Sequence, residues 1–381
     1  RASDFYRGEV AAAFNDTPAA EESFKRVLAN HPHPAIAKRI HEILGSAALR
    51  EGRYVLALSE TDALLAVDPT DQDAKDTRPL LELLSHYPDE AVEQNGVTTA
   101  TVQAVEANLP VSINGKTAAY YCDSGANFSL MTVSEAKRCG MEIKDVSGGG
   151  QAHDINGNMV SIQIALASSL AVGRIVIHNV AFLVVPDGRE PFIDAKPGEA
   201  GLIGLPVMLA IGSMKWNQQG KVIVDRSPKP RDIDHANLCL DGLSVIAQAS
   251  YRNHALPFVL DTGDTSTDLW PKFEQAAQVL IRRSGKVDSY TLSGFAGSEK
   301  FDIISIPRLT LLLGGSTVVL APAHIRKVFK TSATKWFYGN LGVDVLSQYP
   351  TLTLDFRTMT LAIGLAQPRH NRMALNRIKH R

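Results

Sequence analysis

The sequence predicts a mainly β protein in which two homologous β lobes follow an all-α helical domain. Residues 1 to about 88 show helical periodicity and no strand-like alternation. From about Val97, short runs of Val, Ile and Leu are interrupted by Gly, Asn and Asp, which is typical of β-strands and turns. The β region also superposes on itself at an offset of 138 residues (261 − 123). A chain of 381 residues is too long for one ordinary core, so several domains are expected.

The predicted helical domain covers residues 1–88, and its clearest helical pair meets at a turn around Gly52. The stretch resembles a tetratricopeptide repeat through its large and small packing residues and its terminating proline: Leu44, Gly45, Tyr54, Ala57, Leu65 and Pro69. Two or three such units are expected to stack, since one pair cannot bury its faces alone. The domain could bind a peptide or protein partner, or serve as a packing cap or dimer surface. The second role is favoured, because so few repeats make little groove.

Two short motifs in the β region carry the functional prediction. Residues 123–125 are Asp-Ser-Gly and residues 261–263 are Asp-Thr-Gly, and each triplet follows an apolar run that is typical of a buried strand. A single copy would be read as an ordinary turn. Two copies at a fixed offset raise the question of whether they are related.

Two further glycines answer that question. Gly204, in "LIGLPVML", lies 79 residues after Gly125 (204 − 125), and Gly342, in "NLGVDVLS", lies 79 residues after Gly263 (342 − 263). Unrelated turns would not keep that spacing, so an internal duplication is predicted.

The duplication sets the remaining domain limits. Lobe 1 is expected to cover residues 97–225 and lobe 2 residues 238–365, joined by the Pro- and charge-rich "DRSPKPRDIDHA". The basic tail, residues 366–381, is expected to be a solvated terminal helix or a disordered end.

The repeated pattern resembles the aspartic peptidases, both the bilobal pepsins and the dimeric retropepsins. The resemblance covers roughly residues 97–365 and consists of an apolar strand, Asp-Ser/Thr-Gly, a hairpin and a hydrophobic-hydrophobic-Gly triplet, twice over. "CDSGA" is closer to the retropepsin form, and "DTGDTSTDLWP" to the pepsin form, in which a Trp-containing segment follows the motif. Lobes this short suggest a single chain built from retropepsin-sized halves.

The resemblance implies that Asp123 and Asp261 are catalytic. Two carboxyls close together share one proton, a pairing known from the aspartic peptidases themselves, and such a dyad activates a water that attacks the peptide bond. No metal or organic cofactor is required. The resemblance also implies supporting roles: hydroxyls that hold the two turns in register, and glycines that allow close backbone approach or pack beneath each turn. These residues are Ser124, Thr262, Gly125, Gly263, Gly204 and Gly342.

A hairpin in each lobe occupies the position of a flap, which would cover a bound peptide and exclude water. The predicted flap and substrate-binding residues are His153, Asn156 and Gly157 in lobe 1, and Tyr290, Gly294 and Phe295 in lobe 2. The tyrosine that pepsins carry on the lobe 1 flap is missing, and flap-like hairpins in both lobes resemble a retropepsin more closely.

Two neighbours of the motifs leave alternatives open. Asp264 stands where lobe 1 has Ala126. Pointing inward, Asp264 would raise the pKa values of the dyad; pointing outward, it would be an ordinary turn residue, which is the favoured expectation. Cys122 directly precedes Asp123 on a strand, so its side chain is expected to face the core.

The leading hypothesis is therefore an aspartic endopeptidase that cuts an extended polypeptide. The alternative is a non-catalytic peptide-binding or scaffold protein that uses the two-lobed cleft and the helical repeats. The net charge of -1 and the mixed signs give no reason to expect nucleic acid as a partner, and polar residues interrupt the most apolar region, so no membrane span is expected. The chain begins with Arg1 rather than Met, so export to the periplasm or the medium is one hypothesis.

Overall fold

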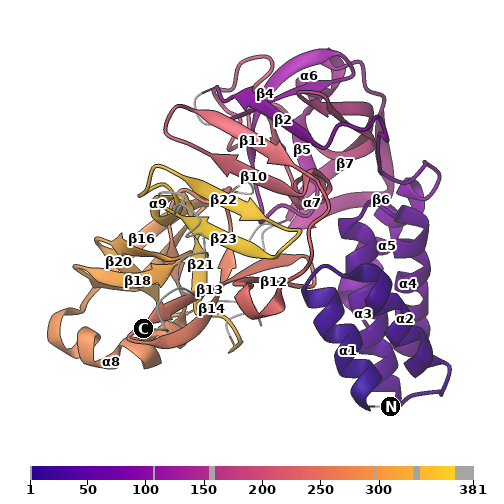
Figure 1. Cartoon of the computed structure of the whole chain (residues 1–381). Coiled ribbons are helices and arrows are strands. Elements are labelled where there is room, and N and C mark those ends of the chain that lie inside the picture. The colour runs from indigo at the N-terminus through magenta and orange to yellow at the C-terminus, as the bar shows by residue number, and fades with distance from the viewer. Residues whose placement is uncertain (1, 106–107, 154–158, 295–296, 329–334, 365–381) are drawn as a thin grey trace, which may run out of the picture.

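The computed structural model describes residues 2–105, 108–153, 159–294, 297–328 and 335–364. It combines an N-terminal block of helices with curved, barrel-like β-sheets (Figure 1). None of the described helices is long and apolar enough to cross a membrane.

The N-terminal segment is helical, as the sequence predicts. Its elements are α1 (Ala2–Ala13), α2 (Thr17–Leu28), α3 (Pro34–Arg50), α4 (Tyr54–Val67) and α5 (Gln72–Leu84). The helices α3 and α4 meet at Gly52, whose φ of 64° lies in the left-handed region that glycine adopts at little cost. Helix α5 begins where the Asp71 carboxylate accepts a hydrogen bond from the Ala74 amide. The predicted helical pair and its turn are confirmed, and the tetratricopeptide character of the segment stays a prediction.

One apolar face of the helical segment packs against lobe 1. Leu81 and Leu84 of α5 form a buried cluster with Phe128, Val146 and Ile164 of the β region. Figure 1 shows α5 beside β6 (Ile143–His153), the strand that carries Val146. A face buried in this way is not available to a partner, which supports the role of a packing cap for at least this side of the helices.

The link between the helices and lobe 1 contains an acidic residue, Glu90, whose burial is not offset by a basic group among the described residues. The Glu90 amide donates a hydrogen bond to the Gly52 carbonyl, 3.0 Å away, and burial raises the pKa of the Glu90 carboxyl from 4.5 to about 8. Between these two pH values the unfolded chain releases the proton while the folded protein retains it. The stability of the protein should therefore fall as the pH rises from 4.5 to 8.

Glu90→Gln is expected to remove this pH dependence. The variant should be more stable than the wild type by about 1 kcal/mol or more at pH 8, and the difference should vanish below pH 4.5, where both states of the wild type are protonated. Urea unfolding at a series of pH values measures the effect. Glu22→Gln, at a side chain that is 75 % exposed, serves as the control and should leave the pH dependence unchanged. If the free energy of unfolding of Glu90→Gln changed with pH in the same way as that of the wild type, the prediction would be contradicted.

Lobe 1 is built on one sheet in which β9 is inserted between β4 and β5. Strand β9 pairs parallel with β4 and antiparallel with β5, so the loop that follows β4 is held against the end of β9. The strand order is β1-β8-β5-β9-β4-β3-β7-β6. The strands not yet given are β1 (Ala91–Val92), β3 (Leu109–Ile113), β4 (Lys116–Cys122), β5 (Ser129–Thr132), β7 (Met159–Val172), β8 (Ile175–Val185) and β9 (Gly201–Ile203), with helices α6 (Val133–Arg138) and α7 (Leu205–Ile211).

Lobe 2 repeats this arrangement, with β21 between β14 and β15. The bounds of β4 plus 138 are those of β14, and the bounds of β9 plus 138 are those of β21, so the offset read from the sequence recurs in the strands. This correspondence supports the predicted duplication. The elements of lobe 2 are β12 (Leu238–Asp241), β13 (Ser244–Tyr251), β14 (His254–Leu260), β15 (Asp268–Leu269), α8 (Pro271–Ser284), β16 (Lys286–Gly294), β17 (Gly297–Ile306), β18 (Leu309–Leu313), β19 (Ser316–Leu320), β20 (Ala323–Arg326), β21 (Gly339–Leu341) and α9 (Val343–Leu346), after a 3-10 turn at Ile233–His235.

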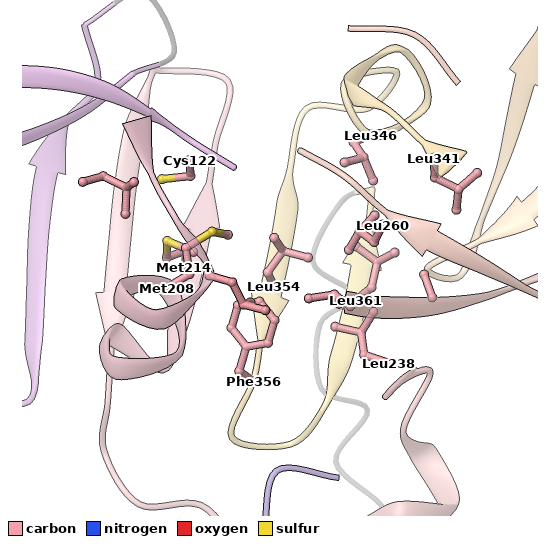
Figure 2. Close-up of a cluster of buried hydrophobic side chains, with 14 of the residues drawn as sticks. Cys122, Met208, Met214, Leu238, Leu260, Leu341, Leu346, Leu354, Phe356 and Leu361 are labelled. Atoms are coloured by element: carbon pink, nitrogen blue, oxygen red, sulfur yellow. The ribbon is translucent and has the colours of Figure 1, made fainter. Parts of the chain in front are cut away.

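A third sheet joins the two lobes. Its order is β2-β11-β10-β22-β23, and β10 of lobe 1 pairs antiparallel with β22 of lobe 2, for example at Met214 and Leu354. The bounds are β2 (Thr99–Gln103), β10 (Ser213–Trp216), β11 (Lys221–Asp225), β22 (Leu352–Asp355) and β23 (Thr360–Ile363). Figure 2 shows Leu354 and Phe356 between Met208 and Met214 on one side and Leu260 and Leu361 on the other. All six side chains belong to one buried cluster, so a continuous core connects the lobes.

Candidate active site

The two Asp-Ser/Thr-Gly turns occupy equivalent places at the ends of strands. Asp123 follows β4, and its amide donates to the Ile203 carbonyl of β9 at 2.8 Å. Asp261 follows β14, and its amide donates to the Leu341 carbonyl of β21 at 3.0 Å. Each aspartate is thus anchored by the strand inserted beside it.

The structure brings the two carboxyl groups face to face. A Cβ atom added at Gly125 would lie 2.7 Å from Cγ of Asp261, and one added at Gly263 would lie closer still to Cγ of Asp123. Only a residue without a side chain fits at either position. Each turn therefore lies directly against the carboxyl of the other lobe, and the charge of Asp261 acts on Asp123.

Main-chain amides hold each carboxylate in place. The amides of Gly125 and Ala126 donate to Oδ1 of Asp123 at 2.8 and 3.1 Å. The amides of Gly263 and Asp264 donate to Oδ1 of Asp261 at 3.0 and 3.2 Å. Such donors favour the ionised form of a carboxyl and fix its orientation.

A ring of hydrogen bonds ties the two turns together. Ser124 Oγ donates to the Leu260 carbonyl at 2.7 Å and accepts from the Thr262 amide at 3.1 Å. Thr262 Oγ1 donates to the Cys122 carbonyl at 2.6 Å and accepts from the Ser124 amide at 3.0 Å. Each hydroxyl therefore serves the chain of the opposite lobe, which keeps the two aspartates in register.

Two glycines lie beneath the turns. The Gly204 amide donates to Ser129 Oγ at 3.1 Å, and the Gly342 amide donates to Thr267 Oγ1 at the same distance. A Cβ atom at Gly204 would overlap the Phe128 backbone, and one at Gly342 would lie 2.8 Å from the Asp264 carbonyl oxygen. The loop carrying each aspartate can reach its position only because these residues are glycines.

Burial and charge act together on the dyad. The pKa of Asp123 is raised well above its usual range, first by burial and then by the charge of Asp261. Burial likewise raises the pKa of the Cys122 thiol to about 12. Cys122 is 8 % exposed, so the prediction that it packs in the core is confirmed, and it holds no thiolate at neutral pH.

Residues 109–207 match the family model described as aspartyl protease. The matched stretch runs from β3 into α7 and so includes Asp123 and Gly204, but it ends before lobe 2. No curated protein matches the chain. Among solved structures, the chain is similar to a retropepsin-like aspartic protease from Rickettsia conorii at 12 % identity, over 36 % of this chain and 95 % of that one, with a TM-score of 0.23. That likeness is too low to carry an argument, so the family evidence rests on the matched segment.

Asp264 points inward, and the expectation that it would be an outward-facing turn residue is wrong. Its Oδ2 accepts a hydrogen bond at 3.2 Å from the side-chain amide of Asn340, which also donates to Oδ2 of Asp261 at 3.2 Å. Burial, together with the charge of Asp261, raises the pKa of Asp264 to about 6. Its Oδ1 accepts from the Ser266 amide at 3.1 Å, as that of a turn residue does, while the Asn340 amide holds Oδ2 on the side of the dyad.

Sequence reasoning also missed Asn340 itself. It lies on β21, in the triplet that ends at Gly342, where the equivalent residue of lobe 1 is Leu202. The exchange of leucine for asparagine at the offset of 138 is the signal that would have identified it.

The predicted flap residues are only partly described. Strands β6 and β7 form a hairpin that is paired as far as His153 and Met159, and Asn156 and Gly157 lie outside the described residues. In lobe 2, β16 and β17 pair up to Gly294 and Gly297. Phe295 also lies outside the described residues.

Of the predicted flap residues, Tyr290 has a contact with the catalytic loop of lobe 2. Its hydroxyl lies 3.5 Å from Ser266 Oγ, and its ring lies 4.8 Å from the ring of His324. The base of the β16–β17 hairpin therefore touches the loop that follows Asp261.

Proposed function

We propose that the chain is an aspartic endopeptidase that hydrolyses extended polypeptides with a water activated between Asp123 and Asp261. The observation that carries this proposal is the pair of carboxyls brought together by the two Asp-Ser/Thr-Gly turns, which are tied to each other by hydrogen bonds across the lobes. The family match of residues 109–207 supports the general class. The two lobes are proposed to be homologous halves, which the repeated strand bounds support.

The geometry suits general acid–base catalysis. One ionised and one protonated carboxyl can hold a water between them; the ionised group takes a proton from the water, and the protonated group gives its proton to the carbonyl oxygen of the scissile bond. The oxygen of the water forms the new bond to the carbonyl carbon, and the C–N bond then breaks as the amine takes a proton. The main-chain amides at the dyad are already oriented, so little reorganisation is needed during the reaction.

The substrate is proposed to bind as an extended strand in the cleft, with apolar side chains favoured on both sides of the cut. The β6–β7 and β16–β17 hairpins are the proposed flaps. The helical segment is proposed to consist of tetratricopeptide-like repeats. Any protein partner would use helical faces other than the one packed on lobe 1.

Cleavage of a proteome-derived peptide library from pH 3 to 8, followed by mass spectrometry, tests the proposal. Wild type is compared with Asp123→Asn and with wild type plus pepstatin, a transition-state mimic for this class. Cuts that disappear in both comparisons are the expected result. No cuts at any pH would overturn the peptidase proposal. If pepstatin then still raised the melting temperature, the two lobes would be a peptide-binding module instead.

A further inference from the structure

The two lobes differ in polarity immediately around their aspartates. Three positions that are apolar in lobe 1 carry polar residues in lobe 2 at the offset of 138: Ala126 and Asp264, Leu130 and Asp268, Leu202 and Asn340. The three lobe 1 residues belong to one apolar cluster. The carboxyl of Asp123 is thus backed by hydrocarbon, whereas that of Asp261 is backed by polar groups.

Asn340 is the lobe 2 residue that reaches the dyad. Its side chain is fully buried, and its Nδ2 atom donates to Oδ2 of Asp261 and to Oδ2 of Asp264, each at 3.2 Å. Both hydrogens of the amide are therefore used on carboxyl oxygens. Leu202, at the equivalent place in lobe 1, has no hydrogen to donate.

As a result, the two aspartate carboxyls accept hydrogen bonds from unequal numbers of donors. Among the described residues, Asp261 accepts from the amides of Gly263 and Asp264 and from the Asn340 side chain. Within the same described residues, Asp123 accepts only from the amides of Gly125 and Ala126. Hydrogen bonds to a carboxylate favour its ionised form, so the third donor favours negative charge on Asp261.

Other charged and titratable groups lie near the dyad in both lobes. They are Tyr121 and Cys122 from lobe 1, and Asp264, Asp268, Asp344 and Arg326 from lobe 2. Arg326 pairs with Asp268, which offsets that charge. Since the pKa of Asp264 is raised to about 6, its carboxyl is neutral in acid and then adds no negative charge beside Asp261.

We propose that Asn340 is a positioning residue that places the shared proton of the dyad on Asp123 and leaves Asp261 ionised. Asp261 then takes the proton of the attacking water, and Asp123 gives its proton to the carbonyl oxygen of the substrate. The assignment of these two steps rests on the proposed peptidase function, whereas the position of the proton in the resting protein does not.

Carbon-13 NMR of aspartate carboxyl carbons tests the position of the proton without any need for turnover. The two signals are assigned with Asp123→Asn and Asp261→Asn. In the wild type between pH 4 and 6, the Asp123 carbon should show the protonated shift and the Asp261 carbon the ionised one. Asn340→Leu, which copies lobe 1, should remove this difference, and the exchange Leu202→Asn with Asn340→Leu should reverse it. Asp264→Ala, which copies Ala126, keeps the Asn340 bond to Asp261 and should leave the proton on Asp123.

The pH profile of kcat/KM gives a second readout. Asn340→Leu should move the acid limb, where the base becomes protonated, to higher pH by about one unit, since one hydrogen bond to a carboxylate is lost. Loss of packing alone would lower activity at all pH values without moving the limb.

A proton on Asp261 in the wild type, or an unchanged pair of signals in Asn340→Leu, would overturn the inference while leaving the peptidase proposal intact. If Asn340→Leu fails to fold, the wild-type spectrum still tests whether the proton lies on Asp123. A proton on Asp123 in a protein that cuts no peptide would support the placement of the proton and overturn the peptidase proposal.

Discussion

Asp123→Asn and Asp261→Asn are each expected to reduce peptide turnover by about 10⁴-fold, the upper end of the loss for a general acid–base group. The loss should be this large because the two carboxyls act as a unit: removing either one leaves the other without the partner that shares its proton. The fold should persist, because an asparagine keeps the shape of the side chain and can still accept from the amides at Oδ1. Each variant should unfold at a temperature equal to or above that of the wild type, since the buried pair then has one ionisable carboxyl fewer.

Turnover of a peptide from the library and thermal unfolding, measured on the same preparations, check this prediction. Asp194→Asn, at an exposed position of lobe 1, is the control and should change neither quantity. Activity within tenfold of the wild type in either dyad variant would assign the cleavage to another group. A large fall in melting temperature would mean that the aspartates hold the fold together instead of catalysing the reaction.

The dyad could be predicted because the motif that carries each aspartate, and the glycine that follows it at a fixed spacing, occur twice in the chain. Gly204 and Gly342 fall at equal distances from their motifs, and the structure shows why: each supports the loop that carries an aspartate, and a Cβ atom would not fit. A spacing that is imposed by backbone contact survives in both halves of a chain, so one sequence is enough to reveal it.

The asymmetry of the site could not be predicted in the same way. Whether Asp264 faces inward depends on the amide of Asn340, which lies 76 residues further along the chain. A turn signal describes the local backbone and does not say which side a carboxyl faces. The burial of Leu84 of the helical segment with Val146 of lobe 1 could not be predicted for a similar reason. The apolar face of a helix shows that something covers it, but the sequence of the helix does not say which surface does so.

Ser124→Ala is expected to lower the free energy of unfolding by about 2–4 kcal/mol. The Ser124 hydroxyl is fully buried, and its loss leaves the Leu260 carbonyl and the Thr262 amide without the partner they have in the wild type. A buried polar group left without a hydrogen-bond partner costs about 1–3 kcal/mol, and the substitution leaves two such groups. Turnover should also fall, by about 10²-fold, because the turn that orients Asp123 is no longer tied to that of Asp261.

Thr262→Val removes the matching pair of bonds and keeps the shape of the side chain, so a double-mutant cycle is possible. We expect the combined loss of stability to be smaller than the sum by about 0.5–3 kcal/mol, since breaking one half of the ring already lets the two turns separate. Urea unfolding of the four proteins gives the coupling energy. Ser168→Ala removes an exposed hydroxyl that bonds to Asn114 and should cost under about 0.5 kcal/mol. Additive losses would mean that each hydroxyl stabilises only its own surroundings, and the register of the two aspartates would then have to come from the sheet that joins the lobes.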